Sequence, residues 1–193
     1  SGTGTPKSVP KFPSKCNDPH WTQVVGPDDS YGYLRLASER GGKYIDTQAD
    51  YLLGFSNGWA DIKEPAVELW TPGSRPNTIP VFGDQDLSKW PPSAFIHWPD
   101  MGPPPANVLD YAKWAHAEWK AGKNIQFGCF GAHGRTGTFL GMLLILADMA
   151  RTGEEAKLLV RTLHCKDAIE TVSQEKALNE FADAVWAPVK TDE

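Results

Sequence analysis

The chain has 193 residues, with 24 acidic against 19 basic side chains and a net charge of −5. Hydrophobic residues make up 40% of it, which is enough apolar surface to offset the entropy of ordering and excludes wholesale disorder. The longest nearly apolar run, residues 139–147, is far shorter than the roughly 20 residues that cross a bilayer. The negative charge disfavours nucleic acid and anionic membranes as partners, and the size fits a single domain.

The cysteines are too few and too scattered to indicate a disulfide scaffold. No two of Cys16, Cys129 and Cys165 form a C-x-x-C pair. So few and scattered cysteines favour a reducing compartment, and we therefore expect a cytoplasmic protein. Neither Cys16 with His20 nor His164 with Cys165 makes the four-ligand pattern of a zinc site. We therefore expect no metal and no cofactor.

The composition changes just past the middle of the chain. Of the 16 prolines, 15 lie at or before Pro105, so the first part is loop-rich and the second helical. Residues 1–20 contain mostly small and polar residues with little that could pack, which predicts a flexible or loosely docked leader. Residues 21–188 are then predicted to form one domain.

The predicted elements alternate between strand and helix. Short runs of β-formers bounded by proline or glycine predict strands at 66–70, 93–98 and 123–129. Apolar residues at helical spacing predict helices at 106–122 and 135–151, a third after a capping box at Thr152 and Glu155, and a fourth from about Ser173. The second helix is apolar nearly all round and must be buried. This alternation indicates an α/β domain.

The segment FGCFGAHGRTGT at 127–138 carries the strongest chemical signal, because a strand ends there at Cys129 and the buried helix begins a few residues later. Its glycines allow a tight turn with the N–H groups pointing inward, and the helix N-terminus adds positive charge, so the hollow should bind a dianion such as phosphate. The same groups favour the thiolate of Cys129, which makes it a nucleophile. Arg135 can hold two phosphoryl oxygens with its planar fork.

Other interpretations of this loop must be weighed. A nucleotide-binding P-loop needs a lysine after its last glycine, which this loop lacks. A buried structural cysteine is the usual fate of a free Cys, but an arginine and a threonine six and seven residues later speak against it. Rhodanese-like and arsenate-reducing proteins also close a cysteine loop with arginine, so the loop alone leaves the chemistry open.

A second motif, WPDMGPP at 98–104, narrows the choice. With it, the chain resembles the cysteine-dependent protein tyrosine phosphatase superfamily. The pattern C-x5-R-T-G at 129–137 is similar to the phosphate-binding signature of that family, and W-P-D at 98–100 to its mobile general-acid loop. The resemblance covers roughly residues 60–187, and residues 1–59 align with nothing that we recognise. It implies one domain with a central mixed β-sheet flanked by helices.

The resemblance also implies a role for each site residue. Cys129 would be the nucleophile, and Asp100 would protonate the leaving oxygen, a contribution of typically 10²–10⁴ in rate, before acting as base toward water. Thr136 would help the thiolate leave, and Gln174 would position water. The competing structural roles are a turn residue for Asp100, a first-turn helix residue for Thr136 and a helix-start residue for Gln174. Phosphate would bind to the loop residues Phe130, Gly131, Ala132, His133, Gly134 and Arg135.

The loop departs from the family pattern at two positions. The family usually has histidine before the nucleophile, where this chain has Gly128, and glycine three residues after it, where this chain has Ala132. Either change could alter the loop geometry, but Gly131 and Gly134 should preserve the ring of amides. His133 could contact the substrate or face solvent.

These motifs predict a metal-independent phosphomonoester hydrolase that acts on phosphotyrosine proteins, with phosphoserine and phosphothreonine also open. The small size resembles the dual-specificity branch, whereas W-P-D and Gln174 resemble the tyrosine-specific branch. One alternative is a phosphotyrosine-binding module without activity, which should have lost Cys129, Arg135 or Asp100. Another is a phosphatase of phosphoinositides or RNA 5′-phosphates, which the lack of lysine in the loop disfavours. We expect a monomer whose partner is a phosphorylated protein or peptide.

Overall fold

The computed structural model describes residues 21–37, 46–56, 91–129 and 131–187. The leader predicted at 1–20 and the strand predicted at 66–70 lie outside these ranges. The described part contains the strands β1 (Trp21–Val25), β2 (Tyr33–Ala37), β3 (Tyr51–Ser56), β4 (Ser93–His97) and β5 (Ile125–Cys129), and the helices α1 (Ala106–Lys120), α2 (Gly134–Leu146), α3 (Gly153–Leu163) and α4 (Val172–Trp186). None of its helices is long and apolar enough to span a membrane.

The five strands form one mixed sheet in the order β1-β2-β5-β3-β4. The β1–β2 pair is antiparallel, and the pairs β2–β5, β5–β3 and β3–β4 are parallel. Parallel strands bring their carboxyl ends to the same edge of the sheet, which is where sites form in α/β folds. Because β4 ends at His97 and β5 ends at Cys129, the two sequence motifs leave the sheet at the same edge, with β3 between their strands.

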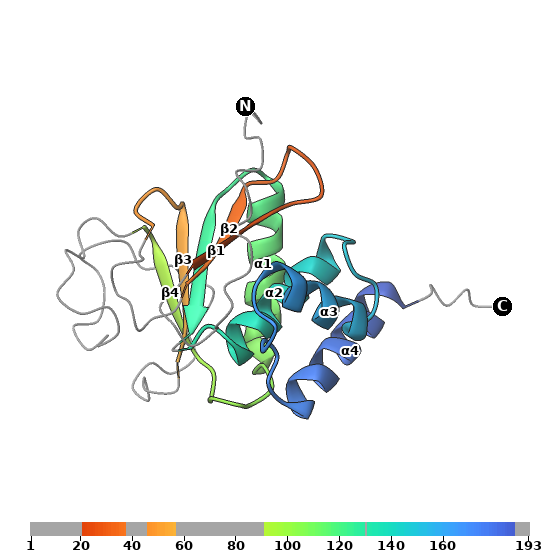
Figure 1. Cartoon of the computed structure of the whole chain (residues 1–193). Helices are drawn as coiled ribbons and strands as arrows, with labels where there is room; N and C mark the ends of the chain where they lie inside the picture. Colours follow the sequence, from red (N-terminus) through yellow and green to blue (C-terminus); the bar gives the residue numbers. More distant parts are fainter. Residues whose placement is uncertain (1–20, 38–45, 57–90, 130, 188–193) are drawn as a thin grey trace.

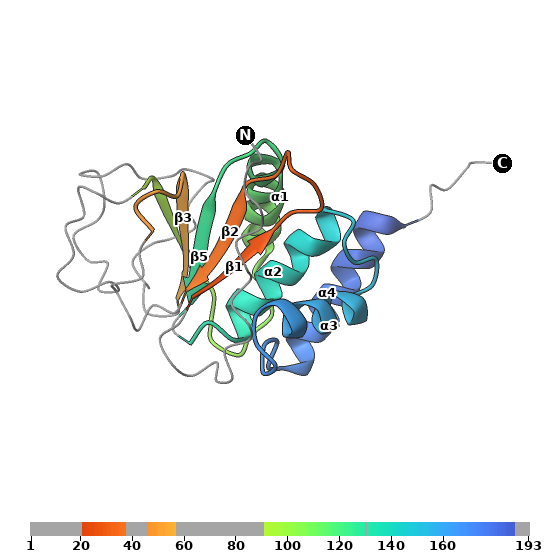
Figure 2. The same cartoon turned by 45° about the horizontal axis from the view of Figure 1, so that its top comes forward.

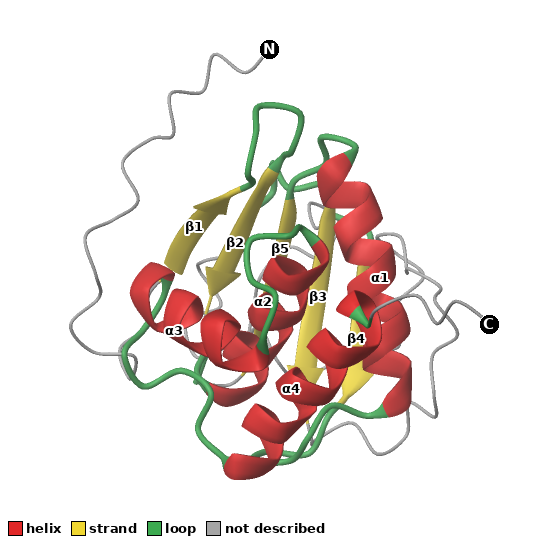
Figure 3. Ribbon diagram, turned by 90° about the vertical axis from the view of Figure 1, so that its right-hand side faces the viewer, coloured by secondary structure: helices red, strands yellow, loops and turns green. Residues whose placement is uncertain are grey.

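All four helices lie on one face of the sheet (Figures 1 and 3). Helix α2 lies between the sheet and the pair α3 and α4 (Figure 2), and it is buried nearly all round, as the sequence predicted. The strands contribute alternate residues to the same core, and the rings of Phe55, Phe127 and Phe139 pack against one another with centroids 4.8–6.4 Å apart. The predicted α/β fold with a central mixed sheet is confirmed.

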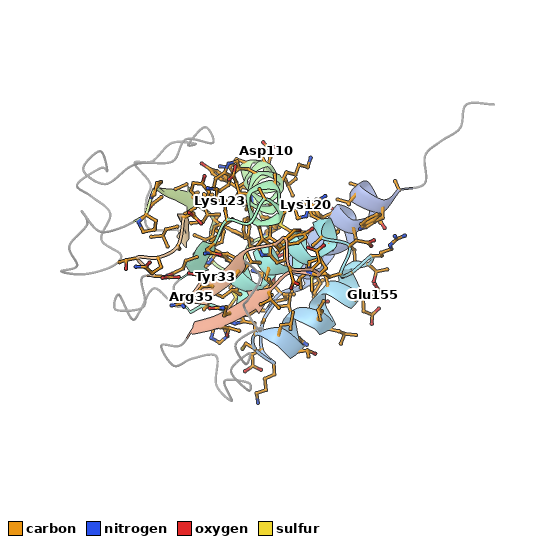
Figure 4. The ribbon with its side chains drawn as sticks, turned by 90° about the horizontal axis from the view of Figure 1, so that it is seen from above. Tyr33, Arg35, Asp110, Lys120, Lys123 and Glu155 are labelled. Atoms are coloured by element: carbon orange, nitrogen blue, oxygen red, sulfur yellow. The ribbon has the colours of Figure 1, made fainter. Side chains whose placement is uncertain are left out.

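A polar network ties the strands together on the opposite face. Tyr33 and Arg35 project from β2 (Figure 4), where the Tyr33 hydroxyl donates to Asp46 and Arg35 Nε lies 3.6 Å from the same carboxylate. The Asp46 N–H donates to the buried Gln126 Oε1 of β5 at 2.7 Å. Burial and the hydrogen bond to Asp46 raise the pKa of Tyr33 well above its ordinary value. This network fixes the chain just before it enters β3.

The helices of the structure agree closely with those predicted from the sequence, whereas three of its strands were not predicted. Helix α2 stops at Leu146 rather than near residue 151, because Asp148 takes a left-handed conformation with φ of 58°. Thr152 caps α3 as predicted, accepting a 3.0 Å hydrogen bond from the Glu155 N–H. The strands β1, β2 and β3 were not predicted, and they supply three of the five strands of the sheet.

Candidate active site

The loop from β5 to α2 places a threonine hydroxyl on the cysteine sulfur. Thr136 Oγ1 donates to Cys129 Sγ over 2.9 Å, and Thr136 is fully buried while Cys129 is 2% exposed. Thr136 lies in the first turn of α2, one residue after Arg135, so the helix geometry itself aims the hydroxyl back at the end of β5. A hydrogen bond of this kind stabilises a sulfur anion whenever one forms or departs.

Carbonyl groups of the loop are held outward by residues beyond it. Ala132 has a φ of 58°, and its carbonyl accepts a 2.6 Å hydrogen bond from Nε2 of the buried His164. The other imidazole nitrogen of His164 lies 3.0 Å from Thr22 Oγ1 in β1. The carbonyl of His133 accepts from the N–H of Ile169 at 3.4 Å. With these two carbonyls engaged on the outside, the loop is arranged as one whose N–H groups turn inward toward an anion.

Arg135 joins this loop to the one that carries Asp100. Its Nη1 donates to the Trp98 carbonyl over 3.1 Å, and its Nη2 lies 3.5 Å from Asp100 Oδ1. The Arg135 side chain is 4% exposed, whereas that of Asp100 is 54% exposed. Arg135 Nε is buried and has no hydrogen-bond partner in the described part of the chain. Since an unpaired buried donor costs about 1–3 kcal/mol, this group suits a bound anion.

The Asp100 loop is a tight turn anchored on one tryptophan. Trp98 is fully buried against Phe55, with ring centroids 5.2 Å apart, and its Nε1 donates to the Gly102 carbonyl over 2.9 Å. The Gly102 N–H donates to the Pro99 carbonyl over 3.0 Å and closes the turn. Asp100 Oδ1 accepts from the next main-chain N–H over 3.0 Å. The Met101 N–H and the Arg135 guanidinium both lie against Oδ1 of Asp100. Oδ2 is therefore the oxygen that would carry a transferable proton.

Gln174 reaches the site but is engaged differently from the expected role in positioning water. Its Oε1 accepts from the main-chain N–H groups of Glu170 at 2.9 Å and Thr171 at 3.3 Å, which completes a capping box for α4. Its Nε2 donates to the Gly102 carbonyl over 3.3 Å. The side chain is buried against Gly134, where an added Cβ would come within 2.9 Å of the amide. Gln174 thus connects α4, the cysteine loop and the Asp100 loop.

The two departures from the family pattern have different physical bases. A Cβ at Gly128 would lie 1.9 Å from the Ala37 carbonyl of β2, so a histidine does not fit there. At Ala132 the backbone is left-handed, a conformation that costs a residue other than glycine roughly 1–2 kcal/mol. The half-buried His133 places its ring over Gly131, and Phe130 lies outside the described residues.

Of the two cysteine and histidine pairs considered for metal binding, Cys16 with His20 lies outside the described residues. Cys165 is disulfide-bonded, and Cys129 is a free thiol. Within the described ranges, no three His, Cys, Asp or Glu side chains lie close enough together to hold a metal ion. His164 supports the cysteine loop instead, a role that its sequence position did not signal.

The fold matches those of several solved structures. Kinase associated phosphatase, with its catalytic-site cysteine replaced, superposes with a TM-score of 0.62 at 16% identity over 89% of this chain and 98% of that chain. Tk-PTP in its active form gives 0.58 at 19% identity, over 78% of this chain and 91% of that chain. PTPMT1 in complex with PI(5)P gives a TM-score of 0.53 at 13% identity, over 79% of this chain and 91% of that chain. The chain has the protein tyrosine phosphatase fold.

The likeness is one of structure and not of sequence. No family model matches the chain, and no curated protein is detectably similar to it. The comparisons therefore support the fold, and the positions of Cys129, Arg135 and Asp100 come from the structure of this chain.

Proposed function

We propose that the chain is a phosphomonoester hydrolase that works through a cysteinyl-phosphate, with phosphotyrosine proteins as its leading substrates. The observation that carries the proposal is the position of Arg135. Its buried guanidinium follows the Cys129 loop, lies 3.5 Å from Asp100 and keeps Nε unpaired. A nucleophile, an anion holder and an acid from two separate motifs thus meet at one point.

In the first step the Cys129 thiolate attacks phosphorus while the bond from phosphorus to the leaving oxygen breaks. Asp100 gives its proton to that oxygen, because an alkoxide or phenolate is a poor leaving group unless protonated. Arg135 and the loop N–H groups hold the non-bridging oxygens, whose charge must be neutralised as the group transfers. The products are a neutral alcohol or phenol and a cysteinyl-phosphate.

In the second step water attacks the cysteinyl-phosphate. Asp100, now a carboxylate, takes the proton from water, the sulfur–phosphorus bond breaks, and its electron pair returns to sulfur as thiolate. Thr136 donates to Cys129 Sγ and stabilises that leaving thiolate. The reaction needs no metal ion, because the thiolate is the nucleophile and the protein supplies the positive charge.

Charge at the edge of the site supports a substrate with one phosphate. Glu170 lies against the cysteine loop, close enough that a Cβ on Gly134 would be 2.9 Å from its Oε1. The cysteine loop itself contains no lysine to hold a second phosphate, which disfavours phosphoinositides and RNA 5′-phosphates. Phosphoserine and phosphothreonine remain alternative substrates.

The monomeric state and the cytoplasmic location stay predictions. The disulfide bond of Cys165 argues against the cytoplasmic location, because disulfides persist mainly in oxidising compartments.

The test is turnover of p-nitrophenyl phosphate in the presence of EDTA. The unaltered chain should turn it over and vanadate should inhibit it, whereas Cys129→Ser should abolish turnover because an alcohol is a far weaker nucleophile. Lys113→Ala, an exposed change on α1, is the matched control and should keep full activity. Full activity in Cys129→Ser would refute the mechanism.

A second measurement separates hydrolysis from binding alone. A chain that binds a phosphotyrosine peptide and turns over no phosphate ester would be a binding module, the alternative from a different class. A panel of matched phosphotyrosine, phosphoserine and phosphothreonine peptides then ranks the substrates, and a preference for the last two would contradict the leading assignment.

A further inference from the structure

The first turn of α4 contacts the Asp100 loop through polar side chains that the proposed chemistry does not use. Thr171 Oγ1 donates to the Met101 carbonyl over 3.1 Å, and Ser173 Oγ lies 3.5 Å from the same carbonyl. The two hydroxyls are also 3.0 Å from each other. Gln174 Nε2 donates to the next carbonyl, that of Gly102. Three donors from one helix end therefore converge on two adjacent carbonyls.

The loop needs such support, because little else holds its outer part. Pro99, Asp100 and Met101 are exposed, so the loop has few apolar contacts beyond Trp98. Met101 has a φ of 62°, at the third position of a turn where glycine is the usual residue. Exposed loops with strained backbone and few buried contacts open easily.

We propose that Thr171, Ser173 and Gln174, here called the α4 latch, are positioning residues that hold Asp100 against the substrate phosphate. The inference rests on the proposed function, since it concerns the acid of that reaction. The latch touches only main-chain carbonyls of the loop, so it sets the position of Asp100 without contacting substrate. When the latch is broken, the loop opens, Asp100 leaves Arg135 and the cysteine sulfur becomes more accessible.

The decisive variant pair separates the latch from the helix cap. Thr171→Gly removes the donor to Met101 together with the oxygen that accepts from the Gln174 N–H at 3.2 Å, but glycine is itself a good N-cap residue and costs only a few tenths of a kcal/mol relative to threonine there. The main-chain N–H at position 171 that pairs with Gln174 survives the change. Thr171→Ser keeps both donor and cap, so it should restore the behaviour of the unaltered chain. Val172→Ala, at a side chain that is 80% exposed between two latch residues, is the control.

The first measurement compares substrates whose leaving groups differ. In Thr171→Gly combined with Ser173→Ala, kcat for phenyl phosphate should fall about tenfold, because two hydrogen bonds of ordinary strength are lost from the closed state. For p-nitrophenyl phosphate, whose leaving group needs little protonation, kcat should fall less than about threefold, and inhibition by vanadate should be nearly unchanged. Equal losses on both substrates would overturn the proposal.

The second measurement does not depend on turnover. The rate at which iodoacetamide alkylates Cys129 should rise several-fold in the double variant and stay unchanged in Thr171→Ser and Val172→Ala, since an open loop exposes the sulfur. An unchanged alkylation rate in the double variant would overturn the latch. If the unaltered chain hydrolyses no phosphate ester but the alkylation rates separate as expected, the proposed function fails while the latch stands.

Discussion

The cysteine loop and the Asp100 loop meet at Arg135 but are built in contrasting ways. The cysteine loop joins a buried strand to a buried helix, and its Ala132 carbonyl is fixed by His164 from outside. The Asp100 loop is exposed over residues 99–101 and is held by hydrogen bonds to its carbonyls. The proposed phosphate-binding loop is thus preassembled, whereas the placement of the proposed acid depends on a few breakable contacts.

The contrast has a physical reason. A nucleophile and its anion hollow work best when they do not reorganise during reaction, so rigid packing favours them. The acid must lie over the substrate during chemistry and leave room for substrate to enter and product to depart, so a loop that opens favours it. Changes in the first loop should therefore affect every substrate, and changes in the second should affect mainly substrates with poor leaving groups.

The largest expected effect that tests this contrast comes from Asp100→Asn. Asparagine keeps the shape but cannot give a proton, so kcat for phenyl or alkyl phosphates should fall by about 10²–10⁴. Turnover of p-nitrophenyl phosphate should fall much less, and vanadate should inhibit as before. The check is a plot of log kcat against the pKa of the leaving group, which should become steeper. Equal losses across the series would show that Asp100 is not the proton donor.

Arg135→Lys tests both loops together, because Arg135 ends the cysteine loop and contacts the Asp100 loop. A lysine ammonium lacks the planar fork that reaches Trp98 and Asp100 while also facing the hollow. We expect a loss of about 10²–10³ in kcat/KM for every leaving group, of the size seen when one oxyanion donor is removed, and a larger loss for poor leaving groups, because Asp100 also loses its partner. Inhibition by vanadate should weaken in parallel. Retention of most activity in Arg135→Lys would contradict the assigned role.

A smaller effect is expected from His164→Ala, which removes the outer support of the cysteine loop. It leaves the Ala132 carbonyl without its donor, a loss of about 1–3 kcal/mol in unfolding free energy for a buried polar group. Denaturant unfolding measures that loss, and kcat should fall equally for good and poor leaving groups. His164→Gln can still donate to the Ala132 carbonyl, so it should recover part of the unfolding free energy and part of kcat. A loss confined to poor leaving groups would place His164 with the Asp100 loop instead.

The sequence predicted the parts of the site that short segments encode. Cys129, Arg135 and Thr136 lie within eight residues, and the turn glycines and the buried helix around them are local signals. The sequence could not predict the roles of the α4 latch and of His164. Each donates to a carbonyl far away in the chain, as Thr171 does to that of Met101.

The missed strands have a similar explanation. The segments of β1 and β2 are short and mix polar with apolar residues, so their strand structure depends on pairing with each other and with β5. In β3 the interior Gly54 weakens the strand signal, yet it pairs with Gly128 of β5, where the sheet approaches Ala37 closely. Such pairing is decided by the whole sheet.

The smallest expected effect lies away from both loops and measures the scaffold alone. His116 of α1 has its Nε2 3.3 Å from the Tyr31 hydroxyl, and burial together with the charge of Lys120 lowers its pKa below the ordinary 6.5. The unfolded chain therefore takes up a proton at higher pH than the folded chain does. Stability from this group is complete above about pH 6.5 and is lost as the pH falls through the lower folded value.

His116→Gln should remove that contribution to the pH dependence. The unfolding free energy, measured by urea at intervals from pH 7.5 to 5, should fall less steeply on acidification in the variant than in the unaltered chain. Because the two proteins differ only at this residue, the difference between the two curves isolates His116. The kcat ratio of good to poor leaving groups should not change, since neither loop is touched. A changed ratio would mean that the scaffold at α1 is coupled to the Asp100 loop, and the separation between a preassembled loop and a latched one would then not hold.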